Sequence, residues 1–349
     1  MTRVRQCLVS AMAVFAVSVG LAVPVHAASA VAEPVTRVMV WGDSMSLAWP
    51  QDLGLLLPVP VQPKGAGAET VQQTQDRFNA WVDANEKTQQ FKTTGHLCWC
   101  GHVNFNRFNY ESANQHPGTI VLTLEAMAKR VPRGLFMPIG LTNSPLEPEG
   151  SVKYDRLMGI NADMAASEHL VSGYADVRGY LVTDGLSVAG ITPTAEDEAS
   201  MRVDVPPPSL RRMKNPADAH LNDAGRRVTA VRLDALIRAE GWLGAAEARS
   251  ATGTALESSA NPSVEGKAFR VQAVVSPVQA GLATPTGTIQ FYAADRPVGP
   301  PVTLVNGIAL SGPIRTLTAG DHTIVGFYTG DATNAPSMTQ FTQVVTSTG

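Results

Sequence analysis

Between Pro34 and Trp242, short apolar runs alternate with segments that have the spacing of amphipathic helices. This alternation favours a parallel sheet with helices on both faces, because parallel strands need long crossover connections. It therefore predicts a three-layer α/β/α domain. The expected strands are residues 37–41, 59–62, 95–100, 134–139 and 174–177, and the expected helices are residues 44–56, 69–84, 119–128, 152–166 and 224–239.

The pattern changes after Trp242. Residues 243–262 are rich in Ala, Ser, Thr and Gly, which is the composition of a linker. From residue 263 to 349, apolar and polar residues alternate with a period of two, as strands do. Short strands of this kind in fewer than about 100 residues predict an all-β sandwich. The clearest alternating runs are residues 269–275, 287–292 and 322–328.

The first 30 residues have the organisation of a secretory signal peptide. Arg3 and Arg5 precede an apolar stretch, and small residues near Ala27 and Ala30 offer a cleavage site. The alternative is a membrane anchor, which the shortness of the apolar stretch does not favour. We therefore expect a signal peptide over residues 1–30, a secreted protein and no membrane span.

Charge and cysteine content narrow the classes of ligand. The net charge of −3 gives no reason to expect nucleic-acid binding. Cys98 and Cys100 alternate with His96 and His102, which suggests a metal site. On a strand, however, these four residues would spread over roughly 20 Å, too far to share one ion. We therefore expect no metal, and either two buried thiols or a strained Cys98–Cys100 disulfide.

Ser44 lies where the first expected strand turns into the first expected helix. The sequence there is WGDSMS, residues 41–46. A serine at such a turn is exposed and close to a helix N-terminus, where backbone N–H groups stabilise a developing oxyanion. The G-x-S-x-G elbow of α/β-hydrolases is not met, because position 46 is serine. Far downstream, His220 offers the general base that a serine nucleophile needs.

Several segments together resemble the SGNH/GDSL hydrolases, and in particular a secreted branch of that family. The resemblance covers residues 38–239 and implies a flavodoxin-like parallel sheet. It further implies an esterase or lipase that needs no cofactor. The segments that carry it are G-D-S at 42–44, GAGAET at 65–70, WCGHVNF at 99–105, ADVRGYL at 175–181, residues 205–211, and HLNDAG at 220–225.

The resemblance assigns roles to residues of this chain. Ser44 corresponds to the nucleophile and His220 to the general base. The oxyanion hole corresponds to Ser44, the backbone of Gly67 or Ala68, and Asn104.

Three of the corresponding positions depart from the family pattern. Ala68 stands where the family has glycine, and Asn104 stands one residue after the family asparagine. Asp218 is two residues before His220, where the family aspartate is three before. Either Asp218 or a backbone carbonyl could orient the imidazole, and the departures leave a weak or inactive enzyme as an alternative.

The last expected helix, residues 224–239, is rich in arginine. We interpret Arg226, Arg227, Arg232 and Arg238 mainly as a solvated helix face.

Turn motifs in the C-terminal segment resemble the bacterial Ig-like repeat of exported proteins, and we find no catalytic cluster there. The motifs are residues 285–288, 304–307, 319–322 and 328–331.

The resulting hypothesis is a secreted serine ester hydrolase. It comprises a signal peptide (1–30), an SGNH/GDSL domain (34–242), a linker (243–262) and an Ig-like β-sandwich (263–349). The substrate would be an acyl ester, either a lipid or an acylated carbohydrate, and it could be bound to a polymer. The alternative is an inactive SGNH domain that acts with the Ig-like domain to bind a glycan or cell-wall polymer.

Overall fold

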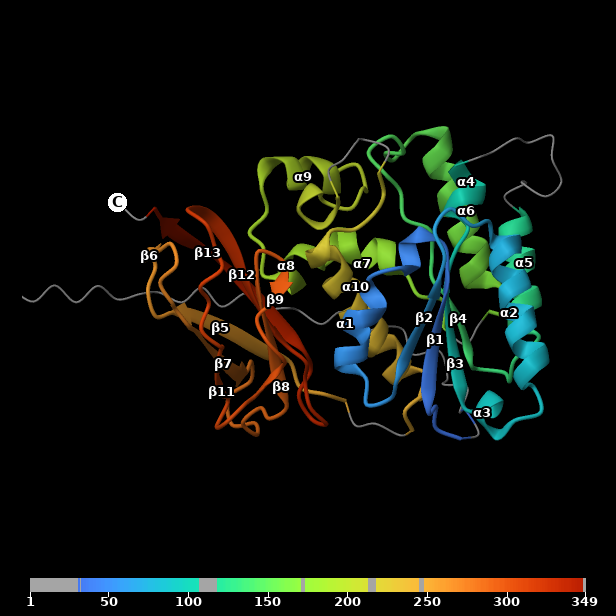
Figure 1. Cartoon of the computed structure of the whole chain (residues 1–349). Helices are drawn as coiled ribbons and strands as arrows, with labels where there is room; N and C mark the ends of the chain where they lie inside the picture. The colour runs from blue at the N-terminus through green and yellow to red at the C-terminus, as the bar shows by residue number, and fades with distance from the viewer. Residues whose placement is uncertain are drawn as a thin grey trace, which may run out of the picture.

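The computed structural model describes residues 31, 33–106, 118–170, 173–212, 218–244 and 248–347 (Figure 1). The expected signal peptide lies outside these residues. Within the described ranges, every helix is too short or too polar to cross a membrane.

The N-terminal part is built on a parallel sheet of four strands in the order β2-β1-β3-β4. A single parallel bridge between Ile139 and Ala175 extends the sheet beyond β4. This bridge is all that forms of the strand expected at 174–177. The predicted parallel sheet is otherwise confirmed, and its strands are β1 (Arg37–Gly42), β2 (Val61–Gly65), β3 (Thr94–Trp99) and β4 (Phe136–Pro138).

Both faces of this sheet are covered. Along β1, Val38 and Val40 belong to one apolar core, whereas Met39 and Trp41 belong to a second core on the opposite face. Successive strand residues point to opposite faces, so a strand with helices on both sides reads as a continuous apolar run. The predicted three-layer α/β/α arrangement is therefore confirmed.

The helices divide between the two faces of the sheet. The first core is shared by α1 (Trp49–Leu56), α7 (Val177–Thr183), α8 (Gly185–Ala189) and α10 (Asp223–Ala239). The second core is shared by α2 (Val71–Asn85), α3 (Gln89–Lys92), α4 (His102–Asn106), α5 (Gly118–Ala128) and α6 (Val152–Ala166). The connections hold α9 (Ala195–Met201) and the 3₁₀ turns η1 (Ser44–Ser46) and η2 (Pro208–Leu210).

The helix expected at 44–56 forms in two pieces. The 3₁₀ turn η1 is separated from α1, which begins at Trp49 with Pro50 in its first turn. Proline is accepted in the first turn of a helix, where its missing N–H would have no acceptor, but it interrupts a helix interior. Pro50 therefore explains why the helix restarts after Ser44.

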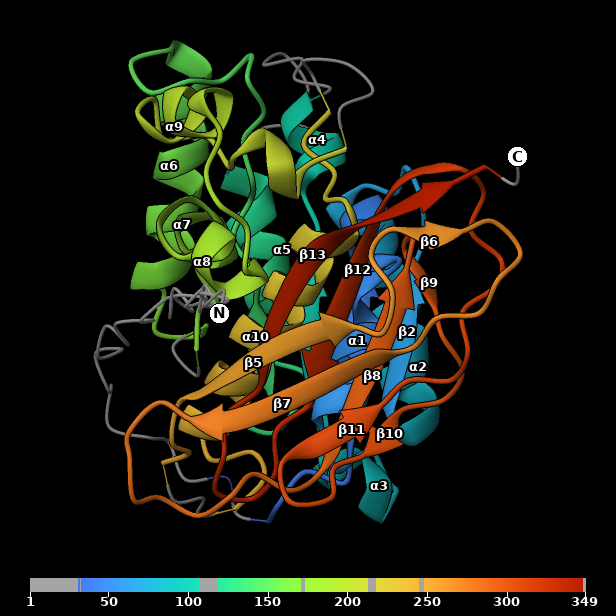
Figure 2. The same ribbon diagram turned by 90° about the vertical axis from the view of Figure 1, so that its left-hand side faces the viewer.

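The C-terminal part is an all-β sandwich, as predicted (Figure 2). One sheet has the order β10-β8-β12-β13-β6 with β9 paired to β8, and the other has the order β11-β7-β5. Its strands are β5 (Thr252–Ser258), β6 (Ser263–Val264), β7 (Val271–Pro277), β8 (Thr288–Ala293), β9 (Arg296–Pro297), β10 (Val302–Thr303), β11 (Ile308–Leu310), β12 (Gly320–Tyr328) and β13 (Ser337–Thr346). Strand β5 falls inside the range 243–262 that the composition favours as a linker.

The sandwich packs directly against α1, α8 and α10. Val325 and Phe327 of β12 are buried in the same apolar core as Trp49 of α1. The guanidinium of Arg227 lies 4.2 Å from the centre of the Tyr292 ring. These contacts bury apolar and charged groups together between the two parts of the chain.

Asp52 of α1 lies beside this interface. Burial raises the pKa of its carboxyl group from 3.8 to about 6. The positive charges of Arg227 and Arg226 and a hydrogen bond from Tyr292 oppose the increase, whereas the negative charge of Asp223 adds to it. The pKa of Asp52 is higher in the folded state than in the unfolded state. Its contribution to the free energy of unfolding is therefore fully present below about pH 4 and is lost as the pH rises through 6.

The variant Asp52→Asn should therefore remove part of the pH dependence of stability. At pH 7 we expect the free energy of unfolding to increase by about 1–3 kcal/mol, and below pH 4 we expect no gain. Urea unfolding at several pH values measures this, with the exposed Asp321→Asn as a control. Equal pH slopes in Asp52→Asn and the unmodified protein would contradict the prediction.

Candidate active site

The turn that carries Ser44 is held by its neighbours in sequence and by β3. The Asp43 carboxylate accepts hydrogen bonds from the N–H of Met45 at 2.9 Å and from the N–H of His102 at 3.2 Å. The Ser46 hydroxyl donates toward the carbonyl oxygens of Trp41 and Trp99, at 2.9 and 3.0 Å. These bonds fix the backbone on both sides of Ser44.

Gly42 allows this turn to approach β3. Its φ of +137° is a conformation that residues with side chains rarely adopt. A Cβ atom placed there would lie 1.9 Å from the carbonyl oxygen of Trp99. The first residue of the G-D-S triplet is therefore glycine for steric reasons.

The variant Gly42→Ala should be strongly destabilising, because neither the conformation nor the space suits a methyl group. We expect a loss of about 3–5 kcal/mol in the free energy of unfolding. Gly159→Ala is the control, because that glycine is in α6 and an added Cβ meets nothing within 4 Å. The control should be stabilised by about 0.5–1 kcal/mol. Similar thermal midpoints for Gly42→Ala and the unmodified protein would contradict the steric account.

His220 lies on a short extended segment just before α10. Arg211 pairs with Leu221 in an antiparallel bridge, and the N–H of Arg212 donates to the carbonyl of His220 at 2.8 Å. Asn222 then caps α10, because its side-chain oxygen accepts from the N–H of Gly225 at 3.0 Å. The bridge and the cap together set the direction of the imidazole.

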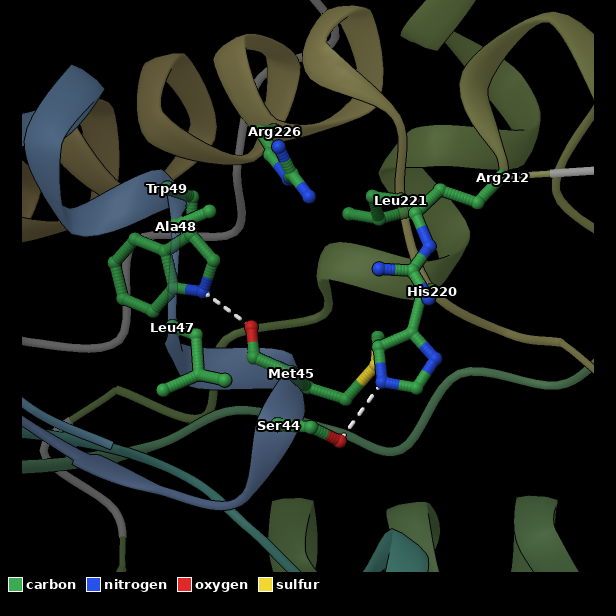
Figure 3. A pocket seen from close by; sticks show the side chains of 9 residues that line it. All are labelled: Ser44, Met45, Leu47, Ala48, Trp49, Arg212, His220, Leu221 and Arg226. Atoms are coloured by element: carbon green, nitrogen blue, oxygen red, sulfur yellow. Dashed lines mark hydrogen bonds between the residues drawn. The ribbon is translucent and has the colours of Figure 1, made fainter. Parts of the chain in front are cut away.

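The structure brings Ser44, His220 and Asp218 together in one chain of hydrogen bonds. Figure 3 shows the bond between Ser44 and His220. The Nε2 atom of His220 lies 2.8 Å from the Ser44 hydroxyl oxygen. The Nδ1 atom lies 2.6 Å from Oδ1 of Asp218. The same carboxylate oxygen accepts the backbone N–H of His220 at 2.9 Å. Spacing of two residues therefore still allows Asp218 to reach the imidazole.

The charges around Asp218 decide which nitrogen carries the proton. Burial of the carboxyl opposes its ionisation, but the hydrogen bonds and charge of His220 and the nearby Arg212 outweigh this and lower the pKa of Asp218. An ionised carboxylate only accepts hydrogen bonds, so Nδ1 of His220 is the donor. In the neutral ring Nε2 is then free to accept the Ser44 proton.

A pocket of about 250 Å³ opens over Ser44 and His220. Its wall is partly apolar, from Met45, Leu47, Ala48, Trp49 and Leu221, and partly basic, from Arg212 and Arg226. In Figure 3 the Ser44 hydroxyl and the His220 ring face each other at one side of this space. The pocket therefore gives a substrate access to the serine.

Gly67 and Ala68, expected as backbone donors, lie in the loop between β2 and α2. The N–H of Ala66 donates to the carbonyl of Gly42 at 2.9 Å, which ties this loop to the turn that carries Ser44. Ala68 has a φ of +62°, the conformation that the family glycine suits and that alanine adopts at a cost. Neither Gly67 nor Ala68 is among the described residues that line the pocket over Ser44.

The Asn104 side chain forms hydrogen bonds with the first turn of α2. Its side-chain oxygen accepts from the N–H of Val71 at 2.8 Å, and its amide donates to the side chain of Gln72 at 2.9 Å. It therefore holds the N-terminus of α2, and the structure does not bring it into the pocket with Ser44. The bond to Gln72 uses one of the two N–H donors of the Asn104 amide, so the oxyanion role of Asn104 stays a prediction.

The interpretation of the arginines of α10 as a solvated face is wrong for two of them. Arg227 is only 3 % exposed and Arg226 lines the pocket, so neither belongs to a purely solvated face. The helix period places residues on a face but does not show what covers that face. Arg212, which lies outside that helix, was not singled out from the sequence.

Cys98 and Cys100 are free thiols buried in the second core. Their sulfur atoms lie 3.0 Å apart. Among the described residues, no group of three or more His, Cys, Asp or Glu side chains could hold a metal ion.

Comparisons with known proteins give three findings. Residues 256–346 match the family model of the bacterial Ig-like domain (group 3), which confirms the resemblance seen in the C-terminal turns. Several similar solved structures are named as lipolytic proteins of the G-D-S-L family or as an SGNH hydrolase. No curated protein matches the chain.

Three of the similar solved structures are described by their identity, TM-score and coverage of the two chains. One, named for a lipolytic protein of the G-D-S-L family from Desulfitobacterium hafniense DCB-2, has 16% identity and a TM-score of 0.40 over 58% of this chain and 99% of that one. A G-D-S-L family member from Veillonella parvula DSM 2008 has 13% identity and a TM-score of 0.39 over 56% and 94%. The catalytic domain of a peptidoglycan O-acetyltransferase from Streptococcus pneumoniae has 11% identity and a TM-score of 0.35 over 59% and 94%.

Proposed function

We propose that this protein is a serine hydrolase of carboxylic esters. The observation that carries the proposal is the continuous chain from the Ser44 hydroxyl through His220 to the Asp218 carboxylate, at 2.8 and 2.6 Å. A serine hydroxyl is a poor nucleophile until a base takes its proton, and a base acts well when a third group orients it.

The reaction would proceed in two acyl transfers. Ser44 Oγ attacks the acyl carbonyl while Nε2 of His220 takes the serine proton, and Asp218 stabilises the imidazolium that forms. The imidazolium returns the proton to the departing alcohol, which leaves an acyl-serine. Water then attacks the acyl-serine while His220 takes a proton from the water. The imidazolium returns this proton to Ser44 Oγ as the bond to the acyl group breaks and the acid leaves.

The oxyanion formed in each step needs hydrogen-bond donors. Ser44 is the first residue of η1, and the first N–H groups of a helix have no acceptor within it. We assign the Ser44 N–H to the oxyanion, together with the backbone of Gly67 or Ala68 in the neighbouring loop. Asn104 is a further candidate, because its amide has two N–H donors and the bond to Gln72 uses only one of them.

A fluorophosphonate probe tests the proposal directly. An activated Ser44 should displace fluoride and form a stable bond from Oγ to phosphorus, and peptide mass mapping should place the adduct on Ser44. The exposed Ser187 and the buried Ser46 provide internal comparisons, because neither has a base of this kind and both should stay unmodified. Absence of an adduct would favour the alternative of a binding protein.

We further propose that the protein acts outside the cytoplasm. The signal-like residues 1–30 support this, as does the Ig-like segment, whose turns resemble those of exported proteins. We propose the Ig-like domain as a contact for a glycan or cell-wall polymer that carries the ester. Co-sedimentation of the full chain with insoluble cell-wall polysaccharide tests this contact, and failure to sediment would contradict it.

A further inference from the structure

Two guanidinium groups line the pocket beside the Ser44–His220 pair. They belong to Arg212 and Arg226, and among the described residues no carboxylate lines the same pocket. Figure 3 shows Arg226 extending from α10 toward the pocket, and Arg212 close to Leu221 and His220. The charged side chains that are described as lining the pocket are therefore both basic, although the chain as a whole has a net charge of −3.

Arg226 has donors to spare for a ligand. Its Nη1 atom bonds Oδ1 of Asp223 at 2.5 Å, in the first turn of α10. A guanidinium has five N–H donors, so this single contact leaves most of them uncommitted. The side chain is 27% exposed, which is enough for a bound group to reach it.

Arg212 is also incompletely paired. Its Nη2 atom lies 3.5 Å from Oδ2 of Asp218, which is a loose ion pair, and its side chain is 36% exposed. Its buried Nε atom has no hydrogen-bond partner among the described residues. Because a guanidinium fork fits a carboxylate or phosphate in two places at once, such an arginine is suited to an anion.

We infer that the pocket selects esters that carry an anionic group, a carboxylate or phosphate, near the ester bond. The inference rests on the proposed ester hydrolysis and names its substrate class. Arg212 and Arg226 bind the anion, and the apolar wall at Leu47, Trp49 and Leu221 takes the uncharged part of the substrate.

Binding to the full-length Ser44→Ala variant tests this inference without turnover. The ligands are 3-acetoxybenzoate and its methyl ester, which differ in the negative charge and in one methyl group. We expect the carboxylate to bind about tenfold more tightly in low salt, by titration calorimetry. We expect most of this preference to disappear at 0.5 M NaCl and on Arg226→Gln or Arg212→Gln in the same background. The exposed Arg296→Gln is the matched control and should keep the preference.

Three outcomes would overturn the inference. These are equal binding of the two ligands, binding of neither, and a preference that survives both pocket substitutions. In the last case the arginines only position Asp218 and Asp223.

Turnover measurements test the substrate class separately from the proposed ester hydrolysis. They also show on which side of the ester bond the anion is recognised. The ratio of kcat/KM for 3-acetoxybenzoate to that for its methyl ester should fall about tenfold in Arg226→Gln. The monoanionic 4-nitrophenyl ester of adipic acid, compared with 4-nitrophenyl hexanoate, reports an anion on the acyl side. Hydrolysis of the neutral esters without an anionic preference would overturn the substrate class alone. Hydrolysis of no ester above Ser44→Ala would overturn the proposed function, and the binding measurement would still decide the anion preference.

Discussion

Replacing either Ser44 or His220 by alanine should reduce ester hydrolysis by about 10⁴–10⁶-fold. Ser44→Ala removes the atom that attacks the acyl group, and His220→Ala removes the base that lies 2.8 Å from it. The double variant should be hardly worse than either single one, because residues that act as a unit have non-additive effects. Initial rates on a panel of short and long acyl esters measure this.

The matched controls are Ser187→Ala and His322→Ala. Ser187 is an exposed residue of α8, and the imidazole of His322 bonds the Thr318 carbonyl in the C-terminal sandwich. Both controls should keep the rate of the unmodified protein. If the unmodified protein hydrolyses no ester faster than Ser44→Ala, the proposed chemistry is wrong, although the α/β/α fold would stand.

Asp218→Ala should lower turnover by about 10³–10⁴-fold while leaving the protein folded. The carboxylate lies 2.6 Å from Nδ1 of His220. In the proposed mechanism it holds the ring in the reactive tautomer and stabilises the imidazolium. Asp218→Asn should lose a comparable factor, because an amide cannot offer the same negative charge. Circular dichroism and the thermal midpoint separate this loss from unfolding.

Asp321→Asn is the control for this substitution, because Asp321 is exposed on β12. A loss of less than about threefold in Asp218→Ala would mean that another group, such as a backbone carbonyl, orients His220. That outcome would leave the roles of Ser44 and His220 intact. The prediction therefore concerns the orientation of the imidazole alone.

The architecture was readable from the sequence because its signals are local. Continuous apolar runs such as residues 37–41 mark strands that are buried on both faces, and the helical spacing between them gives the parallel sheet. The motifs that contain Ser44 and His220 indicated the candidate pair, whose side chains lie 2.8 Å apart. Short helices were missed, although Thr194 and Asp197 form a capping box at α9 that the sequence displays.

Other features depend on contacts between distant residues. Asn104 caps α2 from a position 33 residues away, which no local pattern encodes. Whether Arg226 faces water or a pocket depends on how the segment at Arg212 returns beside α10. One long-range signal was present: residues 324–328 of β12 are apolar on both faces, which indicates that both faces are covered.

The covered outer face of β12 constrains how such a protein can be recombined. Val325 and Phe327 would meet water in an isolated sandwich, and Trp49 would lose part of its cover in an isolated α/β unit. A foreign sandwich joined after Leu243 would have to present a matching apolar surface to α1, α8 and α10. The two parts are therefore expected to diverge in step, with substitutions on one side of the interface compensated on the other.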